Sequence, residues 1–148
     1  MVKPKIPKNR KQAYAWLVLE KQRINKHFPS FKVRVNGERL SCQGSIQPTD
    51  FSSTYKVEIF YQYDGIPKVR VLEPMIPYDP KIHMFKDESL CLYYWKEEPW
   101  GNNFCIHETI IPWIAEWLIY YEIYQLTEKW LGKTASEEIE RKVQQPED

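Results

Sequence analysis

The chain has 148 residues, a formal net charge of +1 and an aromatic content of 15%, which together suit one compact domain with an interior rich in rings. A charge this close to zero predicts no nucleic acid or membrane partner, and the longest apolar run is too short to span a bilayer. Three widely spaced cysteines make no disulfide framework, and the lysine-rich start lacks the apolar core of a signal peptide. We therefore expect a cytoplasmic protein with reduced thiols.

The first predicted element is a helix that begins near Asn9 and ends before Pro29. Residues 1–8 precede it, and because they are rich in lysine and proline we expect them to be flexible. Asn9 can cap the first turn, and Leu17 and Ile24 belong to an apolar stripe at helical spacing. The opposite face is basic and suits either solvent or a docking partner; it carries Arg10, Lys11, Lys21, Arg23 and Lys26.

Four segments that alternate between apolar and polar residues follow this helix. The pairs Asn36-Gly37 and Asp64-Gly65 each lie between two such segments and are typical of tight turns between antiparallel strands. The pattern therefore predicts a four-stranded antiparallel meander. Its expected strands are residues 31–35, 40–46, 55–63 and 68–72.

A proline-containing stretch, residues 73–88, separates the last predicted strand from Cys91. Prolines spaced along it prevent both a helix and a central strand, so we expect a structured loop that leads to the thiol. A second polar loop follows at residues 97–103, after a short apolar run. Cys91 therefore lies between two loops.

The last predicted element is a long helix that begins at Ile110, is capped by Thr109 and ends at Gly132. It has almost no polar face, so it either runs through the centre of the domain or keeps aromatic surface for another protein. Residues 134–148 are a charged tail. We divide the chain into the flexible start, one domain over residues 9–133, and this tail.

The order of helix, meander, proline-rich loop, cysteine, tryptophan loop and long helix resembles the ubiquitin-conjugating enzymes, which have an α+β fold. In that family a His-Pro-Asn motif precedes the catalytic cysteine, with its Asn eight residues upstream. Here Lys81-Ile82-His83 occupies that place, with His83 at the offset of the Asn. Ser89-Leu90-Cys91-Leu92 is similar to the family's Ser-Ile-Cys-Leu, and Trp100 lies close to the Trp that follows the cysteine.

A second resemblance is closer, and it concerns the bacterial conjugating-enzyme-like proteins of anti-phage operons, including type II CBASS. In those proteins a His replaces the Asn, and Pro-Trp and Glu-Trp-Leu signatures mark the long helix. The residues that carry this resemblance are His83, Ser89 to Tyr93, Ile111-Pro112-Trp113, Glu116-Trp117-Leu118, Tyr121-Glu122 and Trp130-Leu131-Gly132.

The resemblance implies that Cys91 takes the C-terminus of a cGAS-like nucleotidyltransferase, a cyclic-oligonucleotide synthase, as a thioester. Transfer of that acyl group to an amine would then prime the synthase. A bacterial ubiquitin-like protein is the alternative cargo, and the sequence leaves open whether a separate activating enzyme is a further partner. We predict no cofactor.

The proposed chemistry needs few groups. An exposed thiol at Cys91 suffices as carrier, since it attacks one acyl group and later leaves. The carbonyl oxygen becomes negative during aminolysis, so an N–H from His83 would lower the barrier. Trp100 is expected to pack and fix the loop beside the thiol, and Asn102 and Asn103 are candidates to orient the amine.

Each of these residues also has a less specific interpretation. Cys91 can be a buried small hydrophobe, and His83 a loop histidine bonded to backbone. Because the His-Pro part of the motif is missing, the chain can also be an inactive relative that docks on the synthase and stabilises it, through the long helix or the basic first helix.

A metal site formed by Cys91, Cys105, His83 and His107 has suitable ligand types, but no Cys-x-x-Cys pair is present and the spacing of Cys105 and His107 suits a strand, so we predict no metal. A cysteine protease would usually place its cysteine at the start of a helix, whereas Cys91 precedes the strand-like run Leu92 to Trp95, so the sequence does not favour a protease. Five scattered glycines form no phosphate-binding loop, which leaves nucleotide hydrolysis unsupported.

Overall fold

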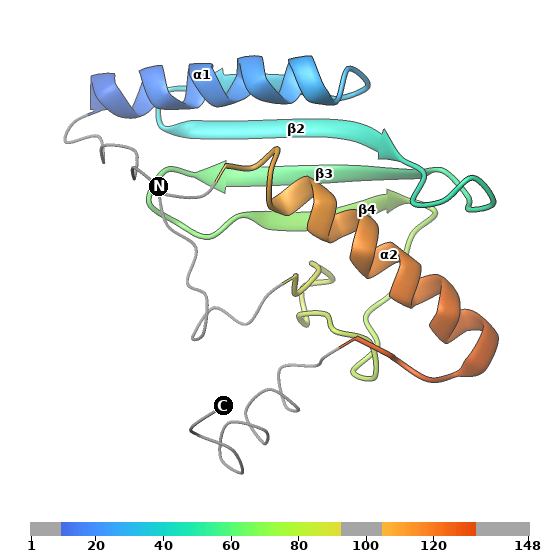
Figure 1. Ribbon diagram of the computed structural model, residues 1–148. Coiled ribbons are helices and arrows are strands. Elements are labelled where there is room, and N and C mark those ends of the chain that lie inside the picture. Colours follow the sequence, from blue (N-terminus) through green and yellow to red (C-terminus); the bar gives the residue numbers. More distant parts are fainter. Residues whose placement is uncertain (1–9, 93–104, 133–148) are drawn as a thin grey trace, which may run out of the picture.

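The computed structural model describes residues 10–92 and 105–132, which form two helices and a four-stranded sheet. The predicted α+β class and the antiparallel meander are therefore confirmed (Figure 1). The predictions for residues 1–8 and 134–148 lie outside the described residues. The elements are α1 (Arg10–His27), β1 (Lys32–Asn36), β2 (Arg39–Ile46), β3 (Tyr55–Gln62), β4 (Lys68–Glu73) and α2 (Ile110–Thr127).

The strands pair in the order β1-β2-β3-β4, all antiparallel. Alternate residues of β2 and β3 point into the core, so the register pairs one buried residue with another, as in Cys42 with Ile59. Both predicted turns are present, and each uses a left-handed residue, Gly37 with φ 62° and Asp64 with φ 68°. The hydrophobic alternation thus fixes which face of the sheet is buried.

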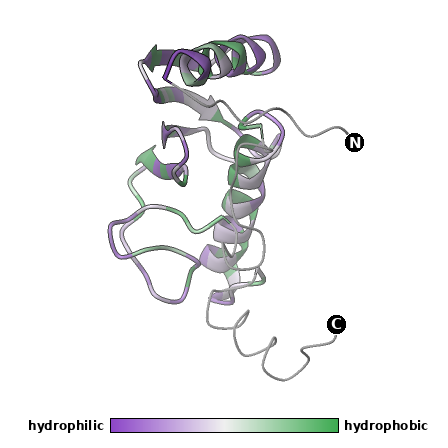
Figure 2. Cartoon of the chain, turned by 90° about the vertical axis from the view of Figure 1, so that its left-hand side faces the viewer, coloured by the Kyte–Doolittle hydropathy of each residue, from purple (hydrophilic) through white to green (hydrophobic). Residues whose placement is uncertain are grey.

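The two helices take different positions on this sheet. Helix α1 contacts β1 and β2, and in the view turned by 90° it lies at one end of the molecule while α2 runs along one side of the strands (Figure 2). No helix within the described ranges is both long and apolar enough to cross a membrane.

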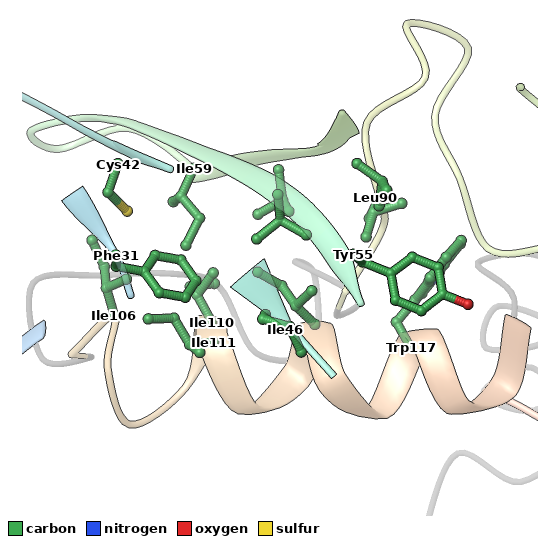
Figure 3. Close-up of a cluster of buried hydrophobic side chains, with 14 of the residues drawn as sticks. Phe31, Cys42, Ile46, Tyr55, Ile59, Leu90, Ile106, Ile110, Ile111 and Trp117 are labelled. Atoms are coloured by element: carbon green, nitrogen blue, oxygen red, sulfur yellow. The ribbon is translucent and has the colours of Figure 1, made fainter. Parts of the chain in front are cut away.

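Helix α2 supplies much of the core. Its buried face meets the sheet across a layer of aliphatic and aromatic side chains (Figure 3). Glu122 on the same helix accepts hydrogen bonds from the Tyr55 hydroxyl, at 2.8 Å, and from the Ser52 hydroxyl, at 2.7 Å. The position of the helix is therefore set by both packing and polar contacts. The buried residues of α2 are Ile110, Ile111, Ile114, Trp117 and Leu118.

Both ends of α2 differ in detail from the prediction. Thr109 does precede the helix, but it makes no side-chain cap, because its hydroxyl donates to the Cys105 carbonyl at 2.7 Å. The helix ends at Thr127 and does not reach Gly132. Glu128 adopts a left-handed conformation with φ 62° and turns the chain out of the helix.

Candidate functional site

Cys91 lies at the end of a tight loop that begins at His83. Met84 and Leu90 form an isolated antiparallel bridge, and the N–H of Cys91 donates to the His83 carbonyl at 3.1 Å. The two residues singled out from their spacing are thus neighbours across one short pairing. At the tip of the loop, Glu88 takes a left-handed conformation with φ 72°.

Two elements hold this loop against the body of the protein. The N–H of Leu90 donates to the carbonyl of Val69 in β4 at 2.8 Å. The indole Nε1 of Trp117 in α2 donates to the His83 carbonyl at 2.9 Å. The His83 carbonyl therefore accepts bonds from Cys91 and from Trp117, and it joins the cysteine loop to α2.

Asp87 organises the loop in front of the cysteine. Its Oδ1 accepts from the backbone N–H and the hydroxyl of Ser89, and its Oδ2 lies 2.8 Å from Lys68 Nζ and 3.6 Å from Arg70 on β4. The bond from Lys68, followed by those from Ser89, holds the pKa of the Asp87 carboxyl well below its usual value. The loop is thereby anchored to β4 by charge as well as by backbone bonding.

The thiol itself is buried, which corrects the expectation of an exposed cysteine. Only 4% of Cys91 is accessible, and its neighbours Ser89 and Leu90 are 2% and 5% exposed. The physical reason is tertiary, since the bond from Leu90 to β4 draws this end of the loop onto the core. His83 is half-buried. The acyl transfer that the sequence predicts at Cys91 would therefore need a conformation in which the sulfur is accessible.

The remaining predicted site residues, Trp100, Asn102 and Asn103, lie outside the described residues, and their roles stay predictions. Sequence reasoning did not assign Trp117 to the site. Trp117 belongs to the Glu-Trp-Leu signature, which indicates the family but does not predict the hydrogen bond from its indole to the His83 carbonyl. Trp117 is 3% exposed and stacks on Tyr121 with ring centroids 5.6 Å apart.

The four residues considered as a metal set do not form one group. Within the part of the chain that the structure describes, Cys105 and His107 lie close to Glu20, and neither Cys91 nor His83 belongs to that group. The expectation that Cys105 and His107 sit on a strand is wrong, because both belong to the turn that leads into α2.

The basic face of α1 also needs one correction. Arg23 is only half-exposed, because it lies 3.6 Å from the buried carboxylate of Glu20 and donates to the Cys105 sulfur at 3.5 Å. Arg10 and Lys26 are exposed. The basic surface is therefore smaller than the sequence suggests.

Comparison with known proteins places these residues in a family. Residues 20–138 match the family described as Type II CBASS E2 protein, a range that includes His83, Cys91 and the whole of α2. A search of curated proteins gives no match.

Proposed function

Because the chain belongs to the family of type II CBASS E2 proteins, we propose that it is a conjugating-enzyme-like acyl carrier in bacterial anti-phage defence, working in the cytoplasm. Cys91 forms a thioester with the C-terminus of a cGAS-like cyclic-oligonucleotide synthase and passes that acyl group to an amine, which primes the synthase. The observation that carries the proposal is the family match over residues 20–138. It is supported by Cys91, which lies in this range and donates its backbone N–H to the carbonyl of His83, eight residues upstream. In this proposal the two helices and the sheet belong to a ubiquitin-conjugating-enzyme-like domain over residues 9–133.

The reaction has two displacements. The Cys91 thiolate attacks the C-terminal carbonyl carbon of the cargo, which an activating enzyme presents with a good leaving group, and that group departs as the carbon–sulfur bond forms. An amine then attacks the same carbon, loses a proton to solvent and expels the Cys91 thiolate. The products are an amide and the free enzyme.

The loop contributes positioning to this reaction. The His83 carbonyl accepts hydrogen bonds from Cys91 and from Trp117. These bonds fix the backbone position from which the His83 side chain extends. In the proposal an N–H of that ring stabilises the negative oxygen of the tetrahedral intermediate, a contribution typically worth on the order of 100-fold in rate. Trp100, Asn102 and Asn103 are proposed to shape the path of the amine.

The test is to trap the adduct. The chain is purified with its synthase and activating partner and examined by mass spectrometry for a thiol-sensitive mass on the peptide that contains Cys91. We expect the adduct in the wild type and in a Cys42→Ala control, and none in Cys91→Ala. We expect His83→Ala to transfer about 100-fold more slowly, because it lacks the proposed donor to the oxyanion. An adduct that persists in Cys91→Ala contradicts the carrier mechanism.

The burial of Cys91 favours a second candidate, a docking protein that stabilises the synthase without acyl chemistry. In that case Cys91→Ala stimulates cyclic-oligonucleotide synthesis as well as the wild type does. If the cargo is a bacterial ubiquitin-like protein, the trapped mass on Cys91 identifies it directly.

A further inference from the structure

Glu20, Cys105 and His107 converge from α1 and from the turn before α2. One ligand-type atom from each residue, a carboxylate oxygen, a sulfur and an imidazole nitrogen, lies within 4.8 Å of the other two. In Figure 3, Ile106, which lies between the latter two residues, stands at the opposite end of the core from Leu90, the neighbour of Cys91. The cluster is therefore separate from the thioester site.

The buried carboxylate is the feature that packing alone does not explain. Glu20 is 0% exposed. Its Oε1 accepts from the backbone N–H of His107 at 3.1 Å and lies 3.0 Å from His107 Nδ1. Among the described residues no group donates a hydrogen bond to its Oε2, which is also buried. The guanidinium of Arg23 lies 3.6 Å from Oε2, close enough for an ion pair but too far for a hydrogen bond. This buried oxygen therefore keeps unused bonding capacity, which is costly and which a metal ion would satisfy.

We propose that Glu20, Cys105 and His107 bind one Zn²⁺ ion. Carboxylate oxygen, thiolate sulfur and imidazole nitrogen are the ligand types that zinc takes, and three protein ligands leave a fourth position for water. Binding releases the thiol proton of Cys105 to solvent, and His107 ligates through Nδ1 with its proton on Nε2. The two negative ligands balance the charge of the ion.

A fourth residue supports this assignment. His107 Nε2 lies 3.5 Å from a carboxylate oxygen of Glu108. Histidines that ligate metals commonly direct their second ring N–H at such an oxygen, which fixes the tautomer and the ring orientation. The turn before α2 therefore provides both the ligand and its outer partner.

Arg23 supplies a positive charge beside the three proposed ligands. Its guanidinium lies 3.6 Å from Glu20 Oε2 and 3.5 Å from the Cys105 sulfur. Because 40% of this side chain is exposed, it can turn outward when an ion enters. The zinc ion would then join α1 to the start of α2.

The experiment titrates the full-length chain, without a histidine tag, with Zn²⁺ by calorimetry and with Co²⁺ by absorption spectroscopy. We expect one equivalent of each ion, a thiolate-to-cobalt charge-transfer band in the near ultraviolet, and loss of that band in Cys105→Ser. Zinc affinity in Cys105→Ser should fall by at least about 10-fold, since even removal of an outer partner costs that much. Cys91→Ala is the matched control and should keep both the band and the affinity.

Other results overturn the proposal. It is wrong if the wild-type chain binds neither ion, if Cys105→Ser binds zinc as tightly as the wild type, or if the cobalt band disappears in Cys91→Ala. Glu20→Gln tests the third ligand, and because it alters a buried residue its folding is checked first by circular dichroism. If that variant does not fold, His107→Gln replaces it, with the same loss of affinity expected.

Discussion

Replacement of Trp117 by Phe should loosen the hold of α2 on the cysteine loop. The change removes the N–H that donates to the His83 carbonyl at 2.9 Å, a bond worth about 1 kcal/mol net. The smaller phenyl ring also leaves a cavity, because Trp117 is 3% exposed and its indole fills a buried space. This cavity costs about another 1–2 kcal/mol of global stability. Only the hydrogen-bond part bears directly on the loop.

The assay measures how often Cys91 becomes accessible. Because Cys91 is 4% exposed, we expect a disulfide reagent to react only when the loop opens, and 1 kcal/mol raises the open population about fivefold. We expect Trp117→Phe to label at Cys91 about five times faster than the wild type, as read by mass spectrometry of the Cys91 peptide. Urea unfolding of the same samples gives the change in global stability.

Trp16→Phe is the matched control, since it makes the same substitution on α1, where the indole packs near Tyr61 and Tyr63. It should lower global stability without changing the labelling rate of Cys91 under native conditions. If Trp117→Phe labels Cys91 at the wild-type rate although its stability falls, the bond to the His83 carbonyl does not restrain the thiol. Equal acceleration in both variants would show that labelling follows global unfolding.

Three further predictions concern packing, charge and thiol reactivity. In Gly44→Ala the new Cβ would collide with the Phe31 ring, so we expect the free energy of unfolding in urea to fall by about 1–3 kcal/mol, and an unchanged midpoint would contradict this packing. The pKa of Asp87 is lowered from its ordinary value of 3.8, so the charged carboxylate stabilises the folded state at pH values above 3.8. This contribution is lost as the pH falls below 3.8 and the carboxylate takes up a proton. Asp87→Asn should therefore lose at most about 1 kcal/mol at pH 7, with the difference from wild type shrinking in melts below pH 4; a constant difference would exclude a charge effect. Burial raises the pKa of both the Cys42 thiol, to about 12, and the Cys105 thiol, so exposure decides the order of reaction. Iodoacetamide at pH 8 should modify half-exposed Cys105 first and buried Cys42 only after unfolding, and modification of Cys42 in the folded protein would contradict this.

The sheet was predictable because its strands and turns are determined by residues that are close together in the sequence. Alternation of apolar and polar residues decides which side of a strand is buried, and Gly37 and Asp64 take the left-handed conformations that the predicted turns require. The end of α2 was mispredicted because glycine is the usual left-handed residue at that position. Here Glu128 takes this conformation four residues earlier than Gly132.

The site was predictable only in part, because its other contacts join distant segments. The eight-residue spacing of His83 and Cys91 predicted a pair that the structure brings together. The burial of Cys91 depends on a bond from Leu90 to β4, which no local pattern encodes. Glu20 lies 87 residues from His107 in sequence, and its place on α1 looks like that of any surface glutamate until the fold is known.

The bond between Leu90 and Val69 has a consequence beyond the cysteine. Strand β4 is the last in the sheet order, and an outermost strand with open backbone groups can recruit a strand from another molecule and start aggregation. The Val69 carbonyl is already engaged by the protein's own loop. The segment that holds the thiol in place thus also discourages self-association along this side of the sheet.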